Sequence, residues 1–405
     1  MSGPIHGIKV LDLTRFIAGP FCSMLLSDMG AEVIKIEPLS GDDTRNVDAY
    51  LIGGESSVFL SLNRGKRSLS MNLEHGETLE VFLDLVRSAD VVIHNYIPGK
   101  DADLGIDYES VRRVNPGIIY CALSAFGDSG PYRNRPGLDM VLQAMGGIMA
   151  ITGEPEGRPM RPGFPVVDAT SGIMAAFGIA LALFDRQKNG KGTVVDLSLL
   201  DHTIAIQTTI ASLYFAKNEN PPRLGNASPF TLAKDFETRD GRHITLSIGH
   251  EGFWQRFRKV LGCRQLTEDS RFDSFNKIYH NMEDLTEICK KRFLEKDGKD
   301  WETILVEGGI PCSLVNTYEQ VFDDKQVKHN QMVFELEHPT AEKIKQVRNP
   351  LIMDKEMMMG NGLPPPLLGE HSREILLGSG YDNERIDFLK AKGFIKCADH
   401  KTGRK

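Results

Sequence analysis

The most informative carboxylate in the chain is Asp168, because it stands at the start of a long apolar segment. The stretch Arg161-Pro-Gly-Phe-Pro-Val-Val-Asp-Ala-Thr-Ser-Gly172 brings this one ionisable group to a predicted helix N-terminus. Helix caps are far commoner than nucleophiles, so position alone favours an N-cap role for Asp168. The two roles are compatible, since a helix start stabilises an ionised carboxylate that can attack a thioester without a general base.

Other chemistries lack their sequence signatures. The chain contains no GxxxxGK[ST], no GxGxxG between a strand and a helix, no GxSxG and no HExxH, which disfavours nucleotide, α/β-hydrolase and zinc-protease sites. The six cysteines are scattered, with no CxxC pair or Cys/His cluster, so we expect reduced thiols and no metal.

Charge and hydropathy bound the location and the partners. A net charge of -7 argues against nucleic acid and anionic membranes as main partners. No signal-like N-terminus and no uninterrupted apolar stretch of about 18 residues is visible, so we expect a cytoplasmic enzyme without a membrane span.

The elements that position Asp168 follow an alternating pattern. Through residue 126, short apolar runs rich in β-branched residues alternate with amphipathic segments, which predicts a parallel sheet crossed by helices. The predicted strands are 8–13, 32–37, 68–73, 91–95 and 118–124, and the predicted helices are 20–29 and 77–88. From Asp168 to Phe184 the chain is apolar nearly all round, which predicts a helix buried on all sides, ending near Gly190. A further inner strand is predicted over 193–199.

The pattern changes after residue 225. Asp240-Gly241 separates two extended runs, 236–238 and 243–248, which predicts a hairpin. Amphipathic segments follow, so about 225–325 is predicted to be a smaller α+β unit. Two extended stretches and two short terminal helices are expected after it.

The chain resembles the class III CoA-transferase family, the formyl-CoA, carnitine and succinyl-CoA type, over essentially its whole length. The order and spacing of many short motifs carry this resemblance. They include Gly7-Ile-Lys-Val-Leu-Asp-Leu-Thr14, Ala18-Gly-Pro20, Gly41-Asp-Asp-Thr-Arg45, Asn63-Arg-Gly-Lys-Arg-Ser68, Asn95-Tyr-Ile-Pro-Gly99, Pro165-Val-Val-Asp168 and Leu367-Leu-Gly-Glu-His371.

The resemblance implies an α/β fold with a Rossmann-like large domain built from both chain ends plus a small α+β domain. It implies domains at 1–224 and 225–325, a return segment at 326–405, and two chains interlocked as rings. Asp168 would form an acyl anhydride and then an aspartyl-CoA thioester, with coenzyme A as substrate and no prosthetic group. The implied CoA cleft contains Phe16, Ile17, Ala18, Met71, Asn95, Tyr96 and Leu104.

Several positions depart from the family pattern or have two interpretations. Relatives commonly carry CoA-binding arginines at the positions of Pro38 and Asp103, so Arg45, Lys66 or Arg67 would have to supply that charge. Asp139 aligns with an acidic residue near the nucleophile, where a catalytic helper role competes with a structural hydrogen-bonding role.

Two alternative functions and the identity of the acceptor acid are open. An α-methylacyl-CoA racemase shares the fold, but the histidine that such enzymes place before an acid is Leu138 here. The chain could also be one subunit of a heteromer with a paralogous chain. The acceptor acid is open, with benzylsuccinate, malate, mesaconate and glutarate as candidates and succinyl-CoA as donor. Arg161 and Arg135 are candidates to hold a second carboxylate, although for each of them a surface role is favoured.

Overall fold

The computed structural model describes residues 3–398. The described chain divides into two compact units. The larger contains the residues up to Gly147, Pro162–Ser212 and the residues from Lys328 onward, and the smaller contains Ile148–Arg161 and Leu213–Val327. The chain therefore leaves the larger unit twice and returns to it.

A seven-stranded sheet forms the centre of the larger unit, in the order β16-β5-β2-β1-β6-β7-β8. The strands are β1 Lys9–Asp12, β2 Glu32–Glu37, β5 Lys66–Met71, β6 Val91–His94, β7 Ile119–Ser124, β8 Thr193–Ser198 and β16 Ile395–Lys396. All neighbouring pairs are parallel except β16 with β5. The predicted parallel sheet is confirmed, and the buried apolar residues of β1, β6 and β7 are typical of such a sheet.

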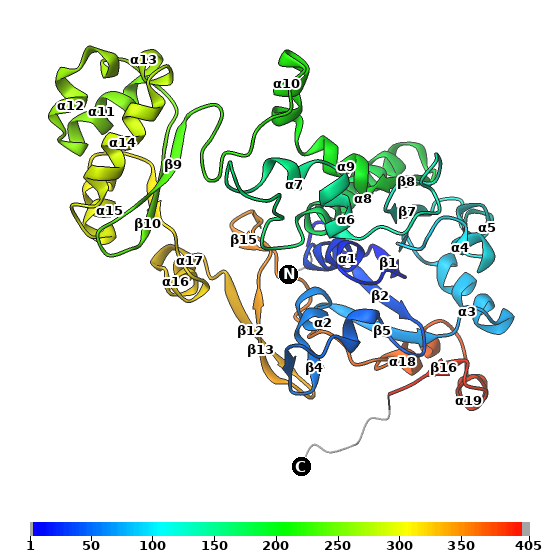
Figure 1. The fold of residues 1–405 in the computed structure, drawn as a ribbon. Coiled ribbons are helices and arrows are strands. Elements are labelled where there is room, and N and C mark those ends of the chain that lie inside the picture. The colour runs from blue at the N-terminus through cyan, green and yellow to red at the C-terminus, as the bar shows by residue number, and fades with distance from the viewer. Residues whose placement is uncertain (1–2, 399–405) are drawn as a thin grey trace. The chain divides into compact units, whose positions relative to one another are not determined.

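Helices connect these strands, and two more helices belong to the last part of the chain, which returns to the sheet. The helices of the larger unit include α1 Ala18–Asp28, α2 Ser57–Leu62, α3 Gly76–Arg87, α4 Lys100–Asp103, α5 Tyr108–Val114, α6 Asp139–Met145, α8 Val166–Asn189, α9 Leu199–Ala205, α18 Ser372–Gly378 and α19 Asn383–Ala391. Figure 1 shows the C-terminal α18 in orange and β16 in orange-red beside the light-blue β5. Residues of α3, α5, α18 and α19 share one buried apolar cluster with the sheet.

Two sequence predictions about burial are wrong. Only one side of α8 is buried, and the other carries an exposed apolar stripe that includes Ile173, Phe177, Leu181 and Phe184, each more than half exposed. Strand β8 lies at the edge of the sheet rather than inside it. The sequence pattern identifies apolar residues, but it does not show whether residues of the same chain or of another chain cover them.

Helix α8 is the one helix in residues 3–398 that is long and apolar enough to cross a membrane, judged by length and composition. A core helix of a soluble protein passes the same test, so this is weak evidence for a membrane span. Its end at Gly190, which has a φ of 72°, agrees with the predicted breaker.

The smaller unit contains the predicted hairpin. Strands β9 Leu232–Glu237 and β10 His243–Ile248 are antiparallel, and β11 Cys312–Leu314 extends this sheet. The helices of this unit include α11 Glu251–Leu261, α14 Met282–Phe293 and α15 Gly298–Glu307. They pack on the sheet around the fully buried Trp254 and Trp301.

In the segment that returns to the larger unit, β12 Val333–His338 pairs with β13 Glu342–Val347.

Candidate active site

One cavity of the larger unit, about 340 Å³ in volume, contains Asp168 in its wall. The remaining wall comes from the start of α1, from the segments that follow β6 and β7, and from the loop before α6. The lining residues are Arg15, Phe16, Ile17, Ala18, Asn95, Tyr96, Ile97, Pro98, Leu123, Ser124, Ala125, Arg133, Arg135, Pro136, Gly137, Leu138, Asp168 and Leu199. The cavity thus lies beyond the carboxyl ends of parallel strands, where open α/β sheets bind ligands.

Asp168 belongs to the first turn of α8 and is not its N-cap. The helix begins at Val166, its N-cap is Pro165, and no side chain of α8 caps it. The carboxylate of Asp139 provides the missing acceptor instead. Its Oδ1 atom accepts hydrogen bonds from the amides of Val167 at 2.9 Å and Asp168 at 3.2 Å. The predicted cap role of Asp168 is therefore wrong, and its own carboxylate is available to the cavity.

The starts of α1 and α8 lie directly against each other. A Cβ atom on Gly172 would stand 2.7 Å from the carbonyl oxygen of Ala18 and 3.3 Å from the amide nitrogen of Cys22. Only glycine allows this approach, so Gly172 is what lets the two helices meet so closely. Both helix N-termini therefore border the cavity, where their partial positive charge favours an anion.

The electrostatics of Asp168 follow from burial and from a second acid. Burial raises the pKa of Asp168 to about 7, and the nearby Asp139 carboxylate adds to this effect. A substantial fraction of the carboxyl group is therefore protonated at neutral pH. The ionised carboxylate expected from the sequence is therefore only partly ionised at this pH.

The structure groups the residues that the resemblance assigns to CoA. Phe16, Ile17, Ala18, Asn95 and Tyr96 line the cavity that contains Asp168. A second cavity of about 180 Å³ contains Met71 and Leu104 in its wall, and it shares Arg15 and Tyr96 with the first. The amide of Asn95 is already engaged, because it accepts from the Arg15 amide at 2.9 Å and donates to the Arg15 carbonyl at 2.7 Å.

Arg45 does not reach either cavity. Its side chain is 9% exposed, donates two hydrogen bonds to Glu37 at 2.7 and 2.8 Å, and donates to the carbonyl of Pro366 at 3.0 Å. Its predicted place in the CoA site is not supported by this geometry. Lys66 is fully buried beside Asp12, and Arg67 pairs with two glutamates, so neither of them supplies charge to the cavities.

The cations that do line the cavities were partly missed by sequence reasoning. Arg15 and Lys100 border the second cavity together with Pro38, and Arg133 borders the first. Arg15 follows the first strand motif and Lys100 follows Asn95-Tyr-Ile-Pro-Gly99, so a position just beyond a strand end was the available signal. Arg135 lines the first cavity, whereas Arg161 belongs to the smaller unit and lines neither cavity.

Leu138 stands at the position where a racemase needs its second acid or base. Leu138 lines the cavity and is 63% exposed. Within residues 3–398, no group of three or more His, Cys, Asp and Glu side chains could hold a metal ion.

We expect Asp168→Asn to stabilise the protein most strongly at alkaline pH. The folded state holds the pKa of Asp168 at about 7, above the usual unfolded value of about 4. The native state therefore binds more protons, and wild-type stability falls as pH rises from about 4 to about 7. Urea unfolding should show a variant advantage of about 1–3 kcal/mol at pH 8 that disappears near pH 4. A difference independent of pH would contradict this.

The family model for CoA-transferase family III matches residues 5–372. The succinyl-CoA:glutarate CoA-transferase of Mus musculus is 36% identical over 98% of this chain and 91% of its own length. The succinate–glutarate CoA-transferase of Agrobacterium fabrum is 36% identical over 92% of this chain and 95% of its own length. A CAIB/BAIF family protein from Brucella suis has a crystal structure that matches with a TM-score of 0.83 and 32% identity, covering 94% of this chain and 100% of that one. The chain therefore belongs to CoA-transferase family III.

Proposed function

We propose that this enzyme transfers CoA from succinyl-CoA to a dicarboxylic acid, with glutarate as the first acceptor to test. Two relatives named for succinate and glutarate support this choice of donor and acceptor. The observation that carries the proposal is a single carboxylate, Asp168, in a cavity bordered by two helix N-termini and three arginines.

The proposed reaction passes through Asp168 twice. Its carboxylate attacks the thioester carbonyl and the C–S bond breaks. CoA thiolate is released, and a mixed anhydride of succinate and Asp168 forms on the enzyme. The thiolate then attacks the aspartyl carbonyl, which releases succinate and leaves an aspartyl-CoA thioester. The acceptor carboxylate attacks this thioester and expels CoA thiolate, forming a second anhydride. Attack of the thiolate on the acceptor carbonyl yields the new CoA ester and regenerates Asp168.

Asp139 acts in this scheme through the main chain. Its carboxylate holds the amides of Val167 and Asp168 and so fixes the first turn of α8. Burial is the larger cause of the raised pKa of Asp168, and the negative charge of Asp139 raises it further. We therefore assign Asp139 a positioning role, because its hydrogen bonds are made to the backbone that carries the nucleophile.

The two cavities suggest how CoA is divided between them. The cavity with Asp168 would hold the thioester, and the cavity with Met71 and Leu104 would hold the remote part of CoA. Arg15 and Lys100 are the cations there that can contact phosphates, and they would replace the arginines absent at Pro38 and Asp103.

Arg135 is the best candidate to hold the remote carboxylate of a dicarboxylic acid. Its guanidinium group stacks over the rings of Phe126 and Tyr132, at 5.7 and 5.2 Å, and forms no hydrogen bond or ion pair within residues 3–398. Arg133 is already bound to Asp128, at 2.7 Å to the carbonyl and 3.3 Å to the carboxylate. The donors of Arg135 are therefore free to bind an anion, and a planar guanidinium suits a carboxylate.

A second chain would complete the larger unit. The stripe of exposed apolar residues on α8 consists of Ile173, Phe177, Leu181 and Phe184, and α6, which contacts α8, carries the exposed Met140. So much apolar surface is typical of a subunit interface. We propose a dimer in the cytoplasm, either of identical chains or with a paralogue. The interlocked rings, the Rossmann-like large domain and the domain limits at 1–224, 225–325 and 326–405 stay predictions.

We expect Asp168→Ala to lower CoA transfer at least about 10³-fold, because it removes the carboxyl group on which the anhydride and thioester intermediates form. Transfer from succinyl-CoA to glutarate should be followed by mass spectrometry of the CoA esters. Asp185→Ala, on an exposed position of the same helix, is the matched control and should retain activity. Full turnover by folded Asp168→Ala would end the proposal.

We expect Arg135→Leu to raise the KM for glutarate roughly 10- to 100-fold, the range for one lost charge-assisted hydrogen-bonded contact. A monocarboxylic acid of the same chain length serves as the internal control, since it has no second carboxylate to lose. Its kinetics should change little in the variant. Equal losses for both acids would show that Arg135 has no part in recognising a second carboxylate.

A further inference from the structure

The segment that enters the cavity from β1 has an unusual backbone. Phe16 has a φ of 67°, in the left-handed region that a bulky aromatic residue rarely occupies. Its side chain is 43% exposed and, like those of Arg15 and Ile17, lines the cavity that contains Asp168. Such a conformation persists only where surrounding contacts determine it.

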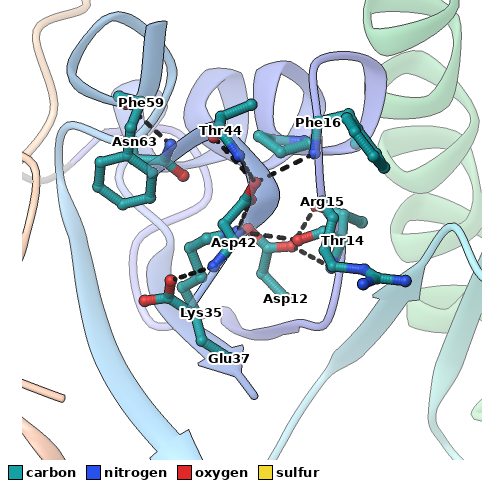
Figure 2. A network of polar contacts seen from close by, with 12 residues as sticks. Asp12, Thr14, Arg15, Phe16, Lys35, Glu37, Asp42, Thr44, Phe59 and Asn63 are labelled. Carbon is teal, nitrogen blue, oxygen red and sulfur yellow. Dashed lines mark hydrogen bonds and ion pairs between the residues drawn. The ribbon is translucent and has the colours of Figure 1, made fainter. Parts of the chain in front are cut away.

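Side chains from other elements hold the main chain of residues 14–16 (Figure 2). Lys35 on β2 donates to the carbonyl oxygen of Thr14 at 2.8 Å, and Asp42 accepts from the amide of Phe16 at 3.3 Å. Asn95, after β6, binds both the amide and the carbonyl of Arg15. Five main-chain groups of this short segment are thus bound by side chains, since the Thr14 amide also donates to Asp12 at 2.9 Å.

Lys35 and Asp42 are themselves joined by a buried ion pair. The ammonium and carboxylate are 2.8 Å apart, and both side chains are fully buried. Burial alone would lower the pKa of Lys35, but Asp12, Asp42 and Glu37 raise it above its usual value. Burial would raise the pKa of Asp42, and Lys35 with Thr44 outweighs this and lowers it. Both groups are therefore charged at neutral pH.

The pair belongs to a larger network with balanced charge. Asp12 contacts Lys66 at 3.1 Å, and Glu37 contacts Arg45 at 2.7 Å. Together with Lys35 and Asp42, these residues make three acids and three bases with almost no exposure. A buried network of this kind is weak evidence for stability, because desolvation offsets the attraction between the charges. Its geometry gives it a more specific role.

We propose that Lys35 and Asp42 are positioning residues for acyl-CoA binding. Their ion pair fixes the ammonium and carboxylate that hold Thr14 and Phe16, and so keeps the cavity-lining segment in its left-handed conformation. The inference rests on the proposed function for the identity of the ligand. It adds two residues that touch neither cavity in the structure and that act on the ligand only through the main chain of residues 14–16.

A second buried ion pair in the same unit provides a matched control. Arg64 and Asp28 form hydrogen bonds of 3.0 and 2.7 Å, and both are buried. Neither residue bonds to residues 14–16. The variants Lys35→Met and Arg64→Met each remove one cation from a buried pair, so both should lower the melting temperature, as expected for an uncompensated buried carboxylate.

The test measures CoA binding by calorimetry and the KM for succinyl-CoA, at a temperature where both variants are folded by circular dichroism. Lys35→Met should weaken CoA binding and raise the KM at least about tenfold, because small displacements of a binding segment have large effects. Arg64→Met should stay within about twofold of the wild type. Equal CoA binding by Lys35→Met and the wild type, or an equal loss in Arg64→Met, would overturn the inference.

If Lys35→Met does not fold, Asp42→Asn and Asp28→Asn form the replacement pair. The Asp42→Asn change keeps an oxygen near the Phe16 amide but removes the ion pair, so CoA binding should weaken more than in Asp28→Asn. Equal binding by these two variants would contradict the positioning role. Wild-type protein that bound no CoA would overturn the proposed function itself, which separates the two failures.

Discussion

The close contact between α1 and α8 is the constraint on which the site depends. Gly172 brings the backbones of the two helices together one turn after Asp168 and beside Ala18, the first residue of α1. A side chain here would separate the two helix starts and open the cavity between them. Because α1 follows β1 and α8 precedes β8, this contact also ties the centre of the sheet to its edge.

The nucleophile of the proposed mechanism is subject to opposing electrostatic effects. Burial and Asp139 raise the pKa of Asp168, whereas the helix starts beside it favour an anion. A carboxylate that is less well solvated than in water is closer in energy to its acylated form, which suits a group that must form and break covalent bonds. The same burial limits the access of water to an anhydride or thioester. The site therefore combines a destabilised Asp168 carboxylate with surroundings that limit hydrolysis of its acylated forms.

Much of the fold could be predicted because its signals are local. Strand β2 follows from its apolar and β-branched residues over 32–37, and the hairpin follows from Asp240-Gly241. Features that depend on distant partners could not be predicted. Arg45 is held by Glu37 and by Pro366, which is far away in the sequence, so its absence from the walls of both cavities could not be predicted. The capping of α8 by Asp139, across 28 residues, likewise displaced the expected cap role of Asp168. The placement of Phe16, Ile17 and Ala18 beside Asp168 followed the resemblance, whereas Arg15 needed the fold.

The central claim is that Asp168 becomes covalently bound to CoA, and peptide mass spectrometry tests it most directly. The wild-type enzyme would be incubated with succinyl-CoA, quenched in acid and digested, and the peptide that contains Asp168 would be measured. The account predicts a CoA adduct on Asp168 that disappears when glutarate is added before the quench and is absent in Asp168→Ala. Turnover with no adduct on Asp168, or an adduct on another residue, would contradict it.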